Sequence, residues 1–109
     1  MNILFICSKN EWRSRTAETI FRNDQRFKVK SAGTSATARI RVNEKLLNWA
    51  DTIFVMEDKH KKRLTESFGN QANHKEIIVL GIPDEYQYMN PELIQELKDA
   101  VDYYLNTGI

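Results

Sequence analysis

The sequence predicts an α/β fold with a four-stranded parallel sheet between two layers of helices. Three short apolar runs, at residues 3–6, 52–56 and 77–80, have the length of strands. Around them, apolar residues recur at helical spacing, and one alternating segment indicates a fourth strand. Alternating strands and helices favour a parallel sheet with helices on both of its faces.

The first half of the chain begins with two strands and a helix between them. The apolar run at 3–6 is continuous, as in a strand that is buried on both faces. Within residues 15–21, apolar side chains recur at i, i+3 and i+4, which predicts a helix. At 27–30, two apolar side chains alternate with two lysines, which indicates an edge strand that ends before Gly33.

The middle of the chain predicts a helix, a central strand and a second helix. Asn43 is expected to cap a helix that contains Leu46 and Leu47. The continuous apolar run at 52–56 predicts a central strand, and the charged segment 58–68 predicts a helix.

The last quarter of the chain predicts one more strand and one more helix. Gly81 closes the apolar run at 77–80. Asn90 and Pro91 then form a helix start, with asparagine as the cap and proline at the first helical position. No repeat or low-complexity linker interrupts the pattern, so we expect residues 1–109 to form a single domain.

Composition narrows the classes of function. The chain has 109 residues, a net charge of +1 and one cysteine, which excludes an internal disulfide framework and cysteine-rich zinc sites. His60 and His74 lack companions for a metal site, and the basic run 59–63 is interpreted as a solvated helix face. We therefore expect no cofactor, no metal, no nucleic-acid or membrane partner and a cytoplasmic location; the oligomeric state is open.

The most informative segment joins the first strand to the first helix. Cys7 stands at the start of this segment and Arg13 at its end, with five residues between them. Backbone N–H groups of such a loop, together with the helix dipole, bind an anion and favour a thiolate at Cys7. Arg13 can then hold two oxygens of a phosphate. The expected phosphate-binding residues are Ser8, Lys9, Asn10, Glu11, Trp12, Arg13 and Ser14. The alternative is a small, buried, inert cysteine at a strand end.

Attack on phosphorus also requires a proton donor for the leaving oxygen. Asp84 follows the last predicted strand, so its loop emerges at the same sheet edge as Cys7. Glu85 is the neighbouring rival, and Pro83-Asp84 also fits an ordinary turn. Tyr86 could stack against a substrate ring as a substrate wall, or could simply pack.

The chain resembles the low-molecular-weight protein tyrosine phosphatase family, as a short and divergent member. The resemblance rests on segments 6–14, 31–34 and 50–56 and on Pro83-Asp84 with Tyr86. It implies a sheet with strand order 2-1-3-4 and phosphomonoester hydrolysis through a phosphocysteine, acting on phosphotyrosine proteins or small aryl phosphates. Carried over by position, it implies that Cys7 is the nucleophile, Arg13 the phosphoryl clamp and Asp84 the general acid and base. Asn10 would hold the loop turn and Ser14 would stabilise the thiolate.

Four departures from the family pattern affect this expectation. Lys9 stands where the family usually has glycine, which predicts strain or a shifted loop. Trp12 stands where many members carry a second cysteine, so an oxidised Cys7 has no partner thiol. Glu85 replaces the usual proline and puts a second negative charge beside Asp84. The segment 35–43 is shorter than in typical members, which would leave the substrate region more open.

Other functions fit the same loop. An arsenate reductase could use it, because arsenate mimics phosphate, but with a single cysteine it would need an external thiol. A non-catalytic phosphate-binding module would keep the loop without turnover. A phosphocysteine carrier of a sugar transport system is more remote, because Arg13 and Asp84 suit hydrolysis better than relay.

Overall fold

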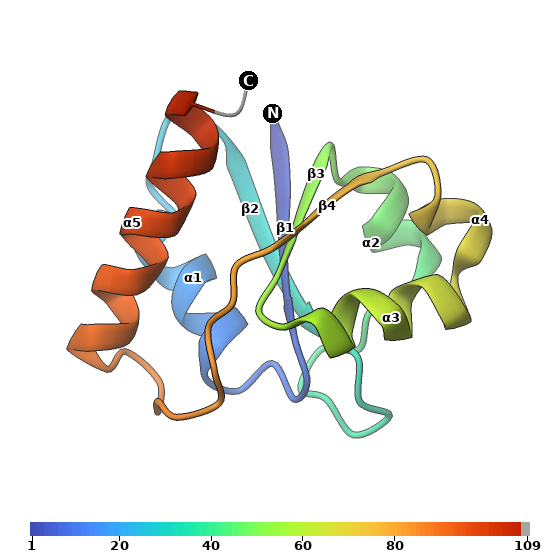
Figure 1. The fold of residues 1–109 in the computed structure, drawn as a ribbon, viewed down its shortest axis with the longest axis horizontal. Helices are drawn as coiled ribbons and strands as arrows, with labels where there is room; N and C mark the ends of the chain where they lie inside the picture. The colour runs from blue at the N-terminus through green and yellow to red at the C-terminus, as the bar shows by residue number, and fades with distance from the viewer. Residues whose placement is uncertain (108–109) are drawn as a thin grey trace.

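The computed structural model describes residues 1–107 and contains a single four-stranded sheet within them (Figure 1). The strands are β1 (Asn2–Cys7), β2 (Lys28–Gly33), β3 (Thr52–Val55) and β4 (Glu76–Val79). The helices are α1 (Arg13–Phe21), α2 (Glu44–Trp49), α3 (Asp58–Ser67), α4 (Gly69–Ala72) and α5 (Pro91–Thr107). Apart from the short helix α4, the alternation of strands and helices is the one that the sequence predicts.

All strand pairs are parallel, and their order in the sheet is β2-β1-β3-β4. This confirms the predicted fold class and strand order. β1 lies between β2 and β3, and Cys7 at its end is in register with Gly33 at the end of β2. The carboxyl ends of the strands therefore surround the loop that follows Cys7, as expected for the ligand-binding edge of an open parallel sheet.

Two helical layers cover the sheet. Helices α1 and α5 cover one face, while α2, α3 and α4 cover the other (Figure 1). Successive side chains of a strand point to opposite faces, so β1 contributes Ile3 and Phe5 to one core and Leu4 and Ile6 to the other. The central strand is thus buried on both sides, as its continuous apolar run predicts.

Helix caps follow the sequence signals. The side chain of Asn43 accepts a hydrogen bond from the backbone N–H of Leu46 at 2.8 Å. Asn90 accepts from the N–H groups of Glu92 and Leu93, at 2.8 and 3.4 Å. Each asparagine satisfies donors that a helix leaves unpaired at its start.

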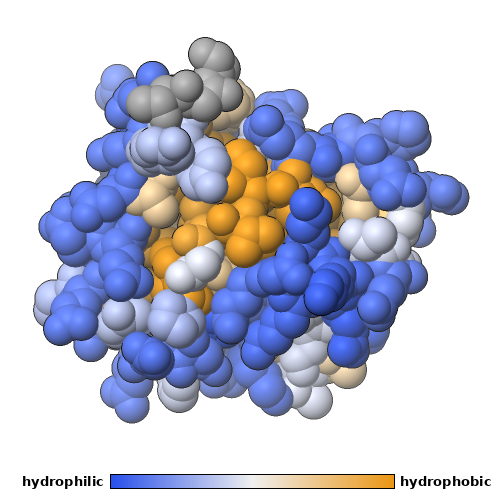
Figure 2. Space-filling model, viewed as in Figure 1, coloured by the Kyte–Doolittle hydropathy of each residue, from blue (hydrophilic) through white to orange (hydrophobic). Residues whose placement is uncertain are grey.

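The structure differs from the expectation at some boundaries. Helix α1 begins at Arg13, two residues earlier than predicted, and β2 extends to Gly33. The short helix α4 has no apolar periodicity that could reveal it. Strand β4 lies at the sheet edge, and its apolar side chains are only half-buried. Figure 2 shows apolar side chains gathered over this strand, beside α5. No helix within the described residues has the length and apolar composition needed to cross a membrane.

Candidate active site

The loop after β1 makes a tight turn around Asn10. This residue has φ 58°, in the left-handed region that asparagine tolerates better than most residues. Its buried side-chain amide donates to the hydroxyls of Ser14 and Ser31, at 2.7 and 2.9 Å. The turn is therefore tied both to the first turn of α1 and to β2, which fixes the loop against the sheet.

The sulfur of Cys7 accepts hydrogen bonds at the floor of this turn. The backbone N–H of Asn10 points at it from 3.2 Å, and the hydroxyl of Ser14 lies 3.0 Å away. The Asn10 amide donates to the Ser14 oxygen, and the Ser14 hydroxyl has two possible acceptors, the sulfur at 3.0 Å and the carbonyl of Ala32 at 3.3 Å. Both contacts hold the sulfur at the floor of the loop, facing the turn around Asn10.

Arg13 lies almost completely buried, with 2% of its side chain exposed. Its Nη1 atom donates to Oε1 of Glu57 at 2.5 Å and to the carbonyl of Ile82 at 2.9 Å. Burial alone would raise the pKa of Glu57, but the hydrogen bond and charge of Arg13 outweigh it and hold that pKa below its usual value. The guanidinium is thus held in one orientation from two different elements.

Asp84 joins these residues from the loop after β4. Its Oδ1 lies 3.7 Å from Nε of Arg13, and 56% of its side chain is exposed. A cavity of about 250 Å³ lies between this loop and the β1–α1 loop, and its lining residues are Cys7, Ser8, Lys9, Glu11, Trp12, Arg13 and Asp84. Asn10 and Ser14 lie buried. A larger hollow of about 770 Å³ lies beside Met1, and no cysteine lines it.

Lys9 does not carry the backbone strain that its place in the family pattern suggests. Among the described residues other than glycine, only Asn10 and Met89 have positive φ. The Nζ atom of Lys9 instead donates to Oγ1 of Thr37 at 2.6 Å, and its carbonyl accepts from the N–H of Arg39 at 2.9 Å. The expected strain is therefore a wrong prediction, and the lysine ties the loop to the segment after β2.

Gly33 allows that segment to approach the loop closely. A Cβ atom at this position would lie 2.3 Å from the carbonyl oxygen of Ser8 and 2.7 Å from Cβ of Ala38. Beyond it, the N–H groups of Thr34 and Ser35 donate to the carbonyls of Cys7 and Ser8, at 3.0 and 2.9 Å. Glycine is required here by space, since any side chain would push the loop out of place.

Comparison with protein families agrees with this geometry. Residues 2–46, which contain β1, the loop, α1 and β2, match the model of the low molecular weight phosphotyrosine protein phosphatase family. The matched segment covers less than half of the chain and is similar to the part of that family that holds its phosphate-binding loop. Among curated proteins, no sequence matches it.

Solved structures of similar fold extend the likeness over nearly the whole chain. The low molecular weight protein tyrosine phosphatase of Streptococcus pyogenes superposes with a TM-score of 0.77 at 21% identity, covering 97% of this chain and 92% of that one. The tyrosine phosphatase Wzb of Escherichia coli K30, in complex with phosphate, gives 0.77 at 21%, covering 96% of each chain. The YwlE arginine phosphatase of Geobacillus stearothermophilus gives 0.71 at 21%, covering 98% and 94%. These similarities show a shared fold.

His60 is a neighbour of the loop after β1 that the sequence pattern does not reveal. It belongs to the basic run 59–63, which predicts a solvated helix face, yet only 1% of it is exposed. Its Nε2 atom lies 2.9 Å from the hydroxyl of Ser8, and its Nδ1 accepts from the N–H of Glu57 at 3.0 Å. The solvated interpretation is wrong for this residue. The available signal was its spacing from Leu64, one helical turn later and also buried.

The environment of His60 keeps it neutral. Burial and the positive charge of Arg13 lower its pKa from 6.5 to about 4. Because Nδ1 accepts a hydrogen bond, the ring proton resides on Nε2 and is donated to Ser8. The hydroxyl hydrogen of Ser8 is then free to point toward an anion in the cavity.

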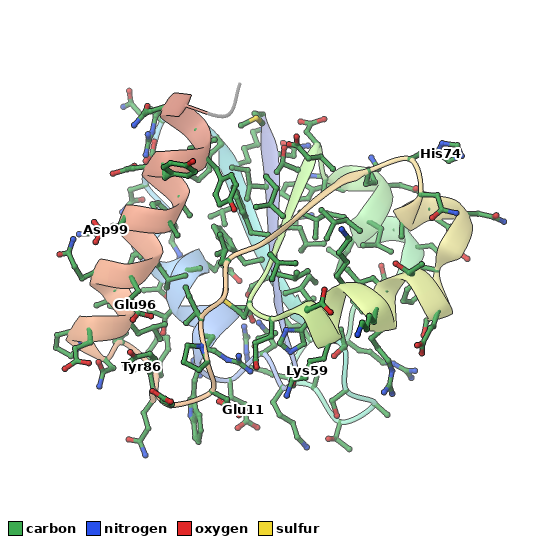
Figure 3. The ribbon with its side chains drawn as sticks, in the orientation of Figure 1. Glu11, Lys59, His74, Tyr86, Glu96 and Asp99 are labelled. Atoms are coloured by element: carbon green, nitrogen blue, oxygen red, sulfur yellow. The ribbon has the colours of Figure 1, made fainter. Side chains whose placement is uncertain are left out.

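Tyr86 is not among the residues that line the Cys7 cavity. It packs against the core that α5 covers, and its hydroxyl donates to Oε1 of Glu96 at 3.1 Å. Figure 3 shows Tyr86 close to Glu96, while Glu11 lies at the end of the molecule where the loop is. The structure therefore brings Cys7, Arg13 and Asp84 together but not Tyr86, whose role as a substrate wall stays a prediction. No cluster of three or more potential metal-ligand side chains occurs in the described part of the chain.

Proposed function

We propose that the protein hydrolyses phosphate monoesters through a covalent phosphocysteine on Cys7. The observation that carries this proposal is one cavity that Cys7, Arg13 and Asp84 line together. The sulfur accepts hydrogen bonds at its floor, the guanidinium lies at its side and a carboxyl group lies at its exposed edge. A site that only binds phosphate would need neither the thiolate nor the carboxyl group.

In the first step the thiolate of Cys7 attacks phosphorus. The S–P bond forms while the bond from phosphorus to the ester oxygen breaks, and Asp84 donates its proton to that oxygen as it leaves. We assign to Arg13 the stabilisation of charge on the phosphoryl oxygens, and we expect the loop N–H groups and the Ser8 hydroxyl to contribute.

In the second step water hydrolyses the phosphocysteine. The carboxylate of Asp84 takes a proton from the water, the water oxygen bonds to phosphorus, and the S–P bond breaks. Phosphate leaves and the Cys7 thiolate is restored. Neither step, as proposed, requires a metal or a redox cofactor.

A nucleophilic thiol without a partner cysteine is preserved best in a reducing compartment, so we also propose a cytoplasmic location.

The proposed substrates are phosphotyrosine in proteins and small aryl phosphates, which match the family. A second candidate is phosphoarginine. The exposed carboxylates of Glu11 and Asp84 among the lining residues would attract its guanidinium leaving group. The fold is also similar to that of an arginine phosphatase.

The test uses para-nitrophenyl phosphate and an acid quench. We expect a rapid burst of nitrophenolate and a mass increase of one phosphoryl group on the peptide that contains Cys7. Because the chain has one cysteine, a phosphoryl adduct on sulfur has a single candidate position. The Cys7→Ser variant should lose turnover and still bind inorganic phosphate.

Several results would contradict the proposal. Full activity of Cys7→Ser would exclude covalent catalysis at this residue. Phosphate binding without any turnover would identify a binding module. Formation of arsenite from arsenate with an added small thiol, without phosphatase activity, would favour the arsenate reductase.

A further inference from the structure

A second cavity adjoins the one that contains Cys7. It measures about 230 Å³, and its lining residues are Ser8, Thr34, Ser35, Lys59, His60 and Arg63. Ser8 lines both cavities, so the two meet at the first residue after the nucleophile. The hydrolysis described above uses no side chain from the far wall of this second cavity, which we call the side cavity.

The charge of the side cavity is positive. Lys59 and Arg63 are four residues apart on α3, so their exposed side chains lie on the same face of the helix. No carboxylate is among the lining residues, and His60 is neutral there. Lys59 has a distant contact with Glu57, at 3.8 Å. Within the described part of the chain, Arg63 has no ion-pair partner, so its charge is available to a ligand.

The Cys7 cavity, in contrast, is lined by charges of both signs, the cations Lys9 and Arg13 as well as two carboxylates. Glu11 and Asp84 line it, and neither lines the side cavity. Figure 3 shows Glu11, from the loop after β1, and Lys59, from α3, at the same end of the molecule. The carboxylates of Glu11 and Asp84 would repel a second anionic group of a ligand, whereas the side cavity beside α3 would attract it.

The position of the side cavity relative to the sulfur is fixed by backbone. The N–H groups of Thr34 and Ser35 donate to the carbonyls of Cys7 and Ser8. The wall that supplies hydroxyls is thus bonded to the catalytic loop itself. An anion in the side cavity would meet two cations and up to three hydroxyls at a set distance from the phosphoryl group.

We propose that the side cavity binds a second phosphate of the substrate, so that the enzyme prefers phosphopeptides that carry two phosphates close together. The inference rests on the proposed function, because it takes the first phosphate to be at Cys7. A phosphate dianion matches the two positive charges, and Arg63 can hold two of its oxygens in parallel. The contact is made before and during reaction alike, so it lowers KM more than it raises kcat.

The test compares two peptides of one sequence. One carries phosphotyrosine alone, and the other carries phosphotyrosine and a neighbouring phosphoserine. We expect the wild-type enzyme to prefer the doubly phosphorylated peptide by about tenfold in kcat/KM, the effect of two partly exposed charge contacts. In the double variant Lys59→Gln/Arg63→Gln, the ratio of the two values should fall to about one. The matched control is Lys62→Gln, which removes a charge from the same helix outside the cavity and should keep the ratio.

Binding measured by calorimetry in the Cys7→Ser background gives the same comparison without turnover. An equal affinity for the two peptides, or a preference that survives in the double variant, would overturn the side-cavity proposal. So would an equal loss of preference in Lys62→Gln, because it would point to a general charge effect. Failure of the proposed function has a different signature, since the wild-type enzyme would then not hydrolyse para-nitrophenyl phosphate at all.

Discussion

The Nε2 atom of His60 lies 2.9 Å from the hydroxyl of Ser8, and this contact joins α3 to the loop after β1. The ring is held in this orientation by a second hydrogen bond, which its Nδ1 atom accepts from the backbone N–H of Glu57. His60 does not line the Cys7 cavity, so it acts through Ser8 as a positioning residue. With the ring proton on Nε2, the Ser8 hydroxyl hydrogen is not used in this contact and can be donated to a ligand.

His60→Gln should lower kcat/KM on para-nitrophenyl phosphate by about fivefold, the value of one hydrogen bond. Ser8→Ala should have a similar effect, and the double variant should lose little more, because the two residues act through one contact. Nitrogen NMR of the wild-type ring should find the proton on Nε2. Additive losses, or a proton on Nδ1, would contradict this role. The exposed His74→Gln is the control.

The protein should become less stable at acid pH because His60 is protonated more readily in the unfolded chain. The pKa of His60 is about 4 in the folded protein and 6.5 without the fold, so the unfolded chain binds the proton first. The contribution of neutral His60 to the free energy of unfolding is complete above pH 6.5. It is lost as the pH falls toward 4, and the loss reaches up to about 3 kcal/mol. Urea unfolding across this range should show a shallower pH dependence in His60→Gln. An identical slope in wild type and variant would rule His60 out as its source.

Glu57→Gln should weaken both the fold and phosphate binding. The change keeps the shape of the side chain but removes the charge opposite the buried Arg13 guanidinium. We expect a loss of about 1–2 kcal/mol in unfolding free energy and roughly tenfold weaker binding of inorganic phosphate. Chemical denaturation and calorimetry measure the two effects. Glu66→Gln, on the exposed face of the same helix, should change neither. Unchanged phosphate affinity would mean that Glu57 does not position Arg13.

Asp84→Asn should alter the pH–rate profile on aryl phosphates. A general acid must carry its proton, so the wild-type rate should fall on the alkaline side as Asp84 ionises, and the variant should lack this limb. The loss in rate should be about 100-fold or more for phenyl phosphate, whose leaving group needs the proton, and smaller for para-nitrophenyl phosphate. Glu85→Gln is the control for charge at this loop. An unchanged profile in Asp84→Asn would remove this residue from the mechanism.

Gly33→Ala should damage the catalytic loop from the neighbouring strand. The new Cβ would meet the carbonyl of Ser8 at 2.3 Å, and that carbonyl is backbone that cannot simply rotate away. We expect a loss of about 1–3 kcal/mol in stability, as for other overpacked sites, together with reduced turnover. Gly69→Ala is the matched control, because a Cβ there meets nothing within 4 Å. Wild-type turnover in Gly33→Ala would show that the loop tolerates the displacement.

Part of this picture follows from local sequence alone. Each of several features is recognisable from a few neighbouring residues: the apolar run of β1, the spacing of Cys7 and Arg13, and the caps Asn43 and Asn90. Backbone periodicity and capping are short-range effects, so they predict the strands, the helices and the loop between them. The place of Asp84 follows one step later, because the carboxyl ends of parallel strands share one edge.

The contacts between elements were decided by the tertiary structure. β3 lies beside β1, so the helix that follows β3 brings Glu57 and His60 to the loop after β1. Nothing near those residues in the sequence reveals this, because the pairing joins segments more than forty positions apart. The same packing turns Tyr86 toward Glu96 and buries one histidine of a basic run. Side-chain burial depends on which elements pack together, whereas the local pattern specifies only which elements form.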